Sequence, residues 1–452
     1  MYRCSNNSID RCDGKSFDTF NSNHKSEDET PTEKVVMESD QQDGKSDFRK
    51  TKMYRQLRPL LVCMRLFGLY FTRAKTLDGK LQTEKVVWWC AFVSVFMIVN
   101  VIRSMTTFYI GESYEHPFFQ KAMFLIWSSE CTLKVVVLFI FCYRQDGLPE
   151  YFTLWSKMCH GIGLDKFCKL LLIKAIVATW IFIIFNSVVF TLVLIYVPIL
   201  DDIYLEVSWR HANLYRTKYQ FKMLLGGLAI FNSSSSLFPI ALYTILCFAL
   251  GLQFQKLTKE LSSAISNEGH LEGNLEDFRL RHEDLCSLVT TLNRVYMPII
   301  AAAYAANIPM FCIVMYTLIY SIDIHISIVL INLFWLTFLL MHLLIISSVA
   351  AWLSSQAHSA LEHIYRLRAH GQSIKDLQLQ ITIFLSRLTG TQIGLSACHL
   401  FVVDRPTILT IAGMMVTYFV LLLQFKLPVG SGVCCCNGTV PENNSVLLIN
   451  AG

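Results

Sequence analysis

The sequence lacks the short motifs that mark the common enzyme classes. It contains no phosphate-cradling glycine loop, no His-Glu-x-x-His helix and no nucleophile elbow. His342, His358 and His363 come without a matching carboxylate, so they do not indicate a metal site. We therefore expect no enzymatic activity, no cofactor, no metal and no nucleic-acid partner.

Charged residues are also scarce. Only 16% of the 452 residues are charged and 53% are hydrophobic, whereas soluble domains have about 25% charged and about 45–50% apolar residues. The apolar residues come in blocks of about twenty or more, long enough to cross a bilayer. These features predict an all-α, polytopic membrane protein.

An apolar core is missing from the first fifty residues, which are rich in Ser, Asn, Asp and Lys. We therefore expect no signal peptide and predict that residues 1–51 form a disordered cytoplasmic arm. The fifteen cysteines lie scattered, mostly singly within apolar runs. This pattern favours buried small side chains over a metal or disulfide framework.

Residues 52–85 form a basic amphipathic segment in which arginines alternate with Leu, Phe and Val. Such a segment can lie on the cytoplasmic leaflet or pack against the helix bundle. The domain that follows, 86–425, contains seven predicted spans, and residues 426–452 form a tail. The spans are 86–109, 118–142, 170–197, 223–252, 297–322, 325–353 and 406–425.

The distribution of Lys and Arg predicts the orientation. Leaving residues 1–50 aside, the segments on the amino-terminal side of the membrane (51–85, 143–169, 253–296 and 354–405) carry 22 of these residues, and those on the opposite side carry 5. The positive-inside rule then places the amino terminus in the cytoplasm and the carboxyl terminus outside. This orientation is opposite to that of G-protein-coupled receptors, and span seven lacks Asn-Pro-x-x-Tyr. A transporter is the other alternative class, but we find no convincing internal repeat.

Two long cytoplasmic loops, 253–296 and 354–405, repeat apolar residues at helical spacing. The second loop ends in an interruption of the apolar pattern, where Gly394, Asp404 and Pro406 precede the last span. We expect helices that project from the membrane, followed by a break before span seven.

The last span ends in Thr417–Phe425, which reads TYFVLLLQF. This pattern resembles the closing signature of the invertebrate gustatory receptor family, within the insect-type chemoreceptor superfamily, and the resemblance extends from about Tyr54 to Phe425. It implies a tetramer in which cytoplasmic helices anchor four subunits and helix seven lines a central pore. Tyr418, Gln424 and Phe425 are then candidates for the pore and gate, with weakly selective cation conduction. The alternative is that Tyr418 and Gln424 only bond neighbouring helices.

Glu130 and Lys134 lie four residues apart in span two, in the order that favours a helical ion pair. Charges at this depth are rare and are usually paired or functional. The sequence leaves two hypotheses open: a pair that satisfies itself, or a pair that contacts ligand or takes part in gating.

A polar run, Asn232 to Ser236, lies in the outer half of span four. Its hydroxyls can bond to their own helix, or they can line a cavity. The family resemblance implies a ligand pocket enclosed by spans two to six. The candidate lining residues are Trp127, Phe190, Tyr196, Asn232, Ser235, Asn332 and Trp335.

We therefore expect a chemosensory receptor that is a ligand-gated cation channel for small-molecule tastants. It would lie in the plasma membrane of sensory cells, in contact with membrane lipid, as a homotetramer or as a heteromer with related receptors. Light or hydrogen peroxide is the alternative stimulus, for which buried tryptophans would matter. The sequence does not choose between these stimuli.

Overall fold

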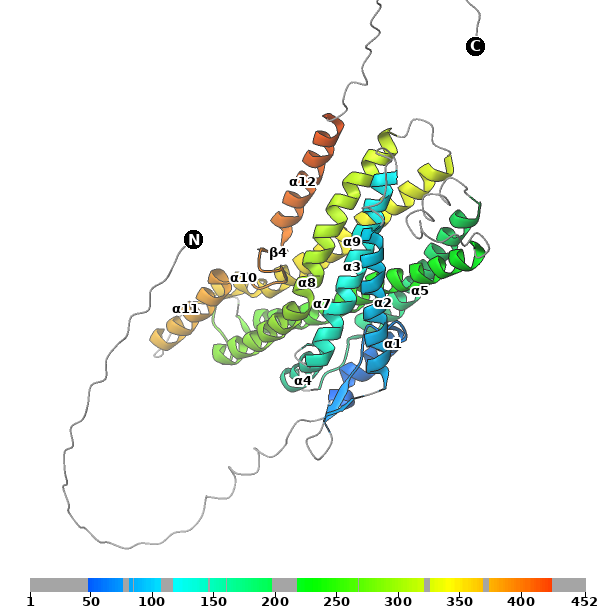
Figure 1. Ribbon diagram of the computed structural model, residues 1–452. Coiled ribbons are helices and arrows are strands. Elements are labelled where there is room, and N and C mark those ends of the chain that lie inside the picture. The colour runs from blue at the N-terminus through cyan, green and yellow to red at the C-terminus, as the bar shows by residue number, and fades with distance from the viewer. Residues whose placement is uncertain are drawn as a thin grey trace, which may run out of the picture. The chain divides into compact units, whose positions relative to one another are not determined.

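The computed structural model describes most of the chain, and all described residues belong to one compact unit, Asp47–Gly452. The described residues are 48–75, 81–83, 85–106, 117–144, 147–159, 161–196, 218–266, 268–320, 326–368 and 374–424. Within them the chain is almost entirely helical (Figure 1). The predicted all-α class is therefore confirmed. Phe425, the tail 426–452 and residues 1–47 of the predicted arm lie outside the described residues.

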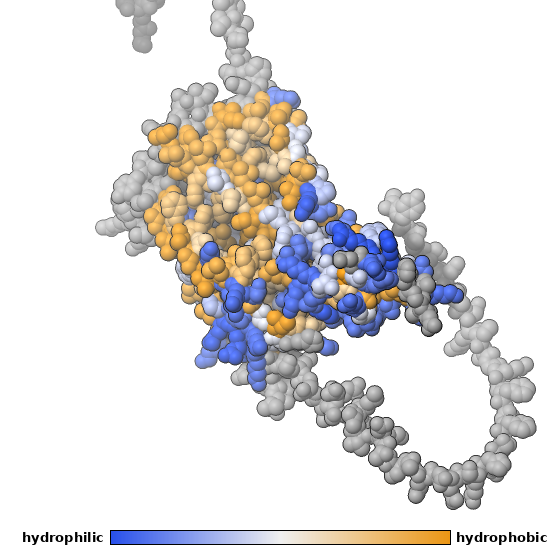
Figure 2. Space-filling view, turned by 180° about the vertical axis from the view of Figure 1, so that it is seen from behind, coloured by the Kyte–Doolittle hydropathy of each residue, from blue (hydrophilic) through white to orange (hydrophobic). Residues whose placement is uncertain are grey.

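Seven apolar helices carry the predicted spans, one span in each helix. They are α2 (Val86–Thr106), α3 (Pro117–Arg144), α5 (Lys166–Tyr196), α7 (Lys218–Ala264), α8 (Leu275–Tyr320), α9 (Ile326–Ala357) and α12 (Arg405–Gln424). Within the described ranges, the first six are long and apolar enough to cross a membrane alone, and α12 has a shorter apolar stretch. Figure 2 shows the corresponding broad apolar surface over one end of the molecule, with polar residues gathered at the other.

Helix α7 is the most deeply covered span. In its most apolar stretch 72% of the residues are buried, more than in the other five long spans, and it packs against α3, α5, α8 and α9. Lipid provides little hydrophobic driving force between helices, so packing and polar contacts must hold them together. The Asn186 amide donates to Ser233 Oγ at 2.7 Å, joining α5 to α7. The Tyr243 hydroxyl donates to the Ile346 carbonyl at 3.0 Å, joining α7 to α9.

Helices α7 and α8 are 47 and 46 residues long. At about 1.5 Å per residue each is about 70 Å long, well over twice the thickness of a hydrocarbon core. Their extensions pack with α10 (Ala360–Tyr365) and α11 (Ile374–Gly390) (Figure 1). In this cluster the buried His282 ring lies 5.3 Å from both Phe254 and Phe384. The loops 253–296 and 354–405 are thus largely helical, and their role as an anchor between subunits stays a prediction.

A short hairpin separates α11 from α12. Strands β3 (Ser396–Ala397) and β4 (Phe401–Val402) pair antiparallel, and Cys398 and His399 between them have positive φ angles of 47° and 59°. The Asn293 side chain holds the hairpin against α8, accepting from the Ser396 amide at 2.7 Å. Asp404 then caps α12 by accepting from the Thr407 amide at 2.9 Å.

The basic segment 52–85 contains a helix and a hairpin. A 3₁₀ turn, η1 (Phe48–Lys50), leads into α1 (Lys52–Leu66), and β1 (Arg73–Lys75) pairs with β2 (Leu81–Thr83). Helix α1 buries one face against α5, α7 and the short α4 (Leu148–Met158). Tyr54, for example, meets Phe152 edge to face at 5.6 Å.

The close approach of α7 and α9 requires glycine at position 251. A Cβ at Gly251 would overlap the Trp352 indole ring, whereas one at Gly227, on the same helix, would meet nothing within 4 Å. Alanine favours a helix over glycine by about 1 kcal/mol, but overpacking costs about 1–3 kcal/mol. We predict that Gly251→Ala lowers the melting temperature of the purified protein, while Gly227→Ala leaves it unchanged or raises it. Equal behaviour of the two variants would contradict this packing.

Candidate functional site

A lysine side chain lies fully buried where four membrane helices meet. Lys134 of α3 has no exposed side-chain surface, and its ammonium lies 2.6 Å from Oε1 of Glu130, one turn earlier on the same helix. A charge removed from water costs several kcal/mol unless it is paired and its remaining protons are bonded. The pair therefore needs further partners.

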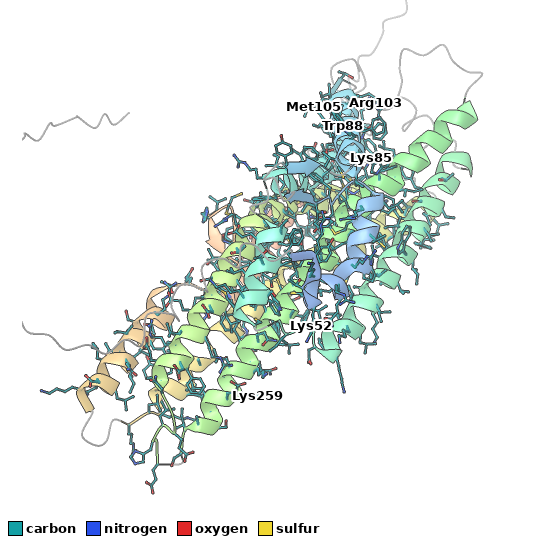
Figure 3. All side chains as sticks on the ribbon, turned by 90° about the horizontal axis from the view of Figure 1, so that it is seen from below. Lys52, Lys85, Trp88, Arg103, Met105 and Lys259 are labelled. Carbon is teal, nitrogen blue, oxygen red and sulfur yellow. The ribbon has the colours of Figure 1, made fainter. Side chains whose placement is uncertain are left out.

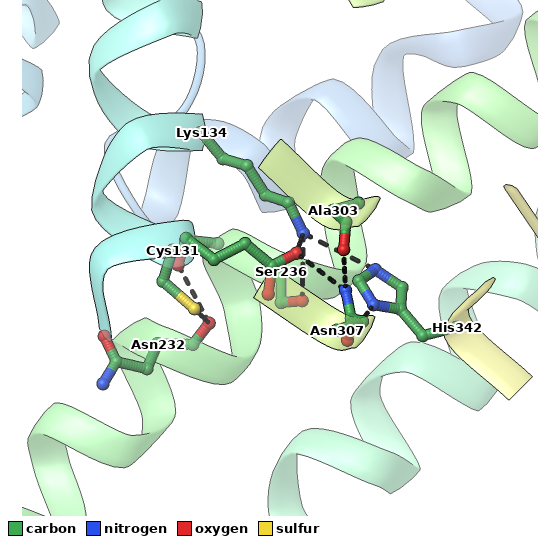
Figure 4. A network of polar contacts seen from close by, with 9 residues as sticks. Cys131, Lys134, Asn232, Ser236, Ala303, Asn307 and His342 are labelled. Carbon is green, nitrogen blue, oxygen red and sulfur yellow. Dashed lines mark hydrogen bonds and ion pairs between the residues drawn. The ribbon is translucent and has the colours of Figure 1, made fainter. Parts of the chain in front are cut away.

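The other three helices supply those partners. The Lys134 ammonium lies 3.3 Å from Ser236 Oγ of α7 and 3.5 Å from His342 Nε2 of α9 (Figure 4). With Glu130, these atoms give each of the three ammonium protons an acceptor. The buried charge thus ties α3 to α7 and α9.

Asn307 of α8 completes this network. Its Oδ1 lies 3.2 Å from His342 Nδ1, and its Nδ2 donates to the Ala303 carbonyl at 2.6 Å and to Glu130 Oε1 at 3.5 Å (Figure 4). Because Oδ1 only accepts, the network assigns the His342 proton to Nδ1 and leaves Nε2 to accept from Lys134. We call Glu130, Lys134, Ser236, Asn307 and His342 the central network.

Asn232 lies one turn from Ser236 on α7 but, unlike Ser236, its side chain is left without hydrogen-bond partners among the described residues. It is fully buried, and within the described part of the chain neither Oδ1 nor Nδ2 of its side chain has a hydrogen-bond partner. Its backbone carbonyl accepts from Cys131 Sγ at 3.3 Å and Ser235 Oγ at 2.9 Å. Native proteins rarely leave buried amides unsatisfied, and a ligand or an ordered water could supply the missing partners of this side chain.

An aromatic cluster lies on the same side of α3. Trp127, one turn before Cys131, meets Trp335 of α9 edge to face at 5.4 Å, and its buried Nε1 also lacks a partner among the described residues. Phe124, Phe334 and Phe338 extend the cluster. Aromatic walls combined with a few directional polar groups are typical of small-molecule sites.

The remaining pocket candidates are distributed over three helices. Phe190 of α5 and Asn332 of α9 are buried, and Ser235 of α7 is 2% exposed. The Ser235 hydroxyl donates a hydrogen bond to the Asn232 backbone carbonyl. Tyr196 ends α5, and its side chain lies outside the described residues. The structure therefore brings Trp127 and Trp335 into direct contact and joins Asn232 to α3 through Cys131.

Helix α12 carries the pore candidates on a largely exposed surface. It contacts α8 and α9, and Ile411 and Met415 are the buried residues among its described side chains. Thr410, Gly413, Thr417 and Gln424 are exposed and share one stripe, which we call the polar stripe, turned away from that buried side. Tyr418 is 49% exposed and lies about 120° from Gln424 around the helix axis.

Sequence reasoning missed Asn307, Ser236 and His342 as partners of the ion pair. Each is a polar residue inside an apolar run, which is the signal that could have found them. Their sequence separations from the pair, 177 residues for Asn307 and Glu130 and 208 for His342 and Lys134, hid the contacts. Among the described residues, no group of three His, Cys, Asp or Glu side chains is arranged to hold a metal ion.

Seven apolar helices joined by buried polar contacts define a polytopic membrane protein. A profile of the family described as "7tm Chemosensory receptor" matches residues 57–428. The chain belongs to this chemosensory receptor family, as the TYFVLLLQF signature predicted. High-energy light unresponsive protein 1 of Caenorhabditis elegans is 24% identical over 219 residues. These residues cover 47% of this chain and 50% of that protein, so the chain spans about half the length of this relative.

Two solved structures share the fold. Both are of the insect olfactory receptor OR5 from Machilis hrabei, one of them in complex with eugenol. The complex has a TM-score of 0.65 at 13% identity and covers 84% of this chain and 100% of its own. The other has a TM-score of 0.63 at 13% identity, with coverages of 82% and 98%. At this identity the likeness establishes the fold.

The central network predicts a large penalty for removing one charge of the pair. Lys134→Met leaves the Glu130 carboxylate buried without a counter-ion, which costs about 3–5 kcal/mol of unfolding free energy. Glu130→Gln/Lys134→Met removes both charges and should recover much of that loss. Unfolding of the purified receptor measures both values, with Lys174→Met on the exposed side of α5 as the control. A double variant no more stable than Lys134→Met would contradict the pairing.

Proposed function

We propose that this receptor is a ligand-gated, weakly selective cation channel that assembles as a tetramer, with α12 lining the pore. The observation that carries the proposal is the polar stripe of α12, an exposed row of polar and small residues on a mostly apolar helix. Polar groups at lipid depth are costly, so such a stripe needs protein or water opposite it.

The apolar surface of α12 supports assembly. Leu409 and Val416 are 75% and 62% exposed, although α12 contacts α8 and α9 on one side. A helix with so little covered surface needs neighbours, which four copies around an axis and the surrounding lipid would provide. Homomers and heteromers with related receptors satisfy this requirement equally.

The chemistry of the polar stripe supports weak selectivity. The Thr410 and Thr417 hydroxyls bond back to the carbonyls of Pro406 and Gly413, so their oxygens remain able to accept but carry no net charge. Gln424 adds a neutral amide, and Phe425 follows it in sequence. The Asp404 carboxylate at the start of α12 is already used as a helix cap. Neutral acceptors near an apolar constriction suit hydrated cations without strong discrimination.

The stimulus in this proposal is a small molecule held near Asn232 and the Trp127–Trp335 pair. The unsatisfied atoms of Asn232 and Trp127 supply one acceptor and two kinds of donor beside an aromatic wall. The eugenol complex of the insect olfactory receptor supports a compact organic ligand. A ligand opens the pore only through its higher affinity for the open state.

Light or hydrogen peroxide is a second candidate stimulus. The relative in Caenorhabditis elegans is named for unresponsiveness to high-energy light, and the Trp127–Trp335 contact places two indoles together. A G-protein-coupled receptor or a transporter is the alternative of another class. Current in a cell that expresses only this chain separates the channel from both, because a channel conducts without host signalling.

The excess of Lys and Arg on the amino-terminal side supports a cytoplasmic amino terminus and an extracellular carboxyl terminus. We place the receptor in the plasma membrane of sensory cells on the basis of its family. Epitope tags at the two termini, read with and without permeabilisation, test this orientation.

If the polar stripe faces the pore, a charge at Gln424 should change ion selection. Gln424→Glu would place four carboxylates around the axis and should raise the calcium-to-sodium permeability ratio severalfold, measured from reversal potentials. Val416→Ala, about 80° away around the helix, should leave the ratio unchanged. If Gln424→Glu and Phe425→Ala both conduct like the wild type, the end of α12 is not the constriction.

The Asn232 amide should strengthen ligand binding, and it should lower the stability of the receptor when no ligand is bound. Asn232→Leu removes buried unsatisfied atoms, so the unliganded protein should unfold no more easily than the wild type. Losing hydrogen bonds worth about 1.5–3 kcal/mol should raise the half-maximal ligand concentration about 10- to 150-fold. Dose-response currents and thermal unfolding measure the two effects.

The control for Asn232→Leu is Thr337→Val, which should change neither effect, because the exposed Thr337 hydroxyl bonds only the Leu333 carbonyl of its own helix. An Asn232→Leu variant that loses stability but keeps its ligand sensitivity would assign Asn232 to packing.

A further inference from the structure

A cavity lined by basic side chains lies beside the start of α1. Its volume is about 650 Å³. Within the described ranges its lining contains five cationic side chains and no carboxylate. The lining residues are Arg49, Lys50, Tyr54, Arg55, Arg58 and Arg65.

Two of these arginines are held in place by the protein. Arg49 Nη2 donates to Thr72 Oγ1 at 2.6 Å, and Arg65 Nη2 donates to the same oxygen at 3.2 Å. Arg65 also lies over the Tyr70 ring, 5.6 Å from its centroid. Thr72 and Tyr70 are fully buried, so this wall of the cavity is preorganised.

The other cations form an exposed rim. Lys50, Arg55 and Arg58 are all exposed, and neither Arg55 nor Arg58 forms an ion pair with another described residue. The rim charges of Lys50, Arg55 and Arg58 repel each other unless an anion neutralises them. Guanidinium groups match the oxygens of phosphate and carboxylate groups with paired hydrogen bonds, so an anion of this kind fits the cavity.

The exposed face of α1 changes character along its length. Its first half presents Lys52, Arg55 and Arg58, whereas Val62 and Leu66 near its end are 52% and 58% exposed. The Leu66 carbonyl accepts from Trp89 Nε1 at 3.0 Å, next to the start of α2. Trp88 there is 79% exposed, and Figure 3 labels it together with Lys52.

This gradient matches the boundary of a membrane. Exposed apolar residues and interfacial tryptophans suit the hydrocarbon edge, and the basic half of α1 then lies at headgroup level. A free anion would fill only the basic cavity and would leave the exposed apolar residues Val62 and Leu66 without a partner. The exposed face therefore favours a ligand that has both a phosphate and acyl chains.

We propose that this cavity binds the phosphorylated headgroup of an anionic membrane lipid, whose acyl chains run along Val62 and Leu66. The inference is independent of channel activity. The bound lipid would fix α1 against the bundle, because α1 also packs on α4, α5 and α7.

The test uses the full-length protein in nanodiscs, where lipid faces both sides and orientation has no influence. The probes are phosphatidylcholine alone, phosphatidylcholine with phosphatidylserine, and phosphatidylcholine with phosphatidylinositol 4,5-bisphosphate. Inositol 1,4,5-trisphosphate in detergent is the soluble arm. Native mass spectrometry and a fluorescent phosphoinositide measure lipid retention and affinity.

We expect the phosphoinositide to bind at least tenfold more tightly than inositol 1,4,5-trisphosphate. Arg55→Gln/Arg58→Gln should weaken the lipid affinity about thirtyfold, which converts to about 2 kcal/mol for two cations. Arg55→Lys/Arg58→Lys keeps the charge and should stay within about fivefold of the wild type. Lys256→Gln/Lys259→Gln removes two exposed cations from the end of α7 and should have no effect.

Two results would overturn the proposal. Equal losses in the Arg55/Arg58 and Lys256/Lys259 variants would show a general charge effect without a site. Soluble inositol phosphate that binds as tightly as the lipid would assign the cavity to a free anion. Failure of the channel proposal would leave these binding results unchanged, because no step depends on current.

Discussion

The structure depends on how a single ammonium group is satisfied inside the bundle. Lys134 is fully buried, and an unpaired charge at that place would cost several kcal/mol, a large part of a typical protein's stability margin. No single helix can offer its three protons an acceptor each. Glu130 supplies one from α3 itself, and α7 and α9 must supply the others. The charge therefore fixes which helices are neighbours and how far each is shifted along its axis.

Hydropathy and local spacing predicted what depends on short stretches of chain. The seven apolar helices follow from continuous apolar runs, and the Glu130–Lys134 pair follows from its spacing of four residues. The partners of that pair could not be predicted, because Ser236 and His342 are 102 and 208 residues away from Lys134. The interruption before α12 was also expected from Gly394 and Pro406. Its hairpin was not expected, since Cys398 and His399 take positive φ angles without glycine.

Two polar residues one turn apart on α7 show why burial alone does not identify function. Ser236 and Asn232 are both buried, but Ser236 bonds Lys134, and the Asn232 amide has no partner within the described ranges. A satisfied group stabilises one packing of the helices. An unsatisfied group costs about 1–3 kcal/mol until something binds it. Asn232 therefore destabilises the protein unless a ligand or an ordered water bonds its amide.

Helix α8 is the physical connection between this region and the proposed pore. It holds Asn307 of the central network, contacts α12 directly, and binds the hairpin before α12 through Asn293. Tyr304 lies about one turn before Asn307 on α8. Its hydroxyl hydrogen-bonds Ser347 Oγ of α9 at 2.7 Å, and its ring centroid lies 5.6 Å from that of Phe401 in the hairpin. Because these contacts share one continuous helix, a shift of α8 at the network must also move the start of α12. Under the proposed function, a ligand that prefers one position of α8 would therefore bias the pore without touching it.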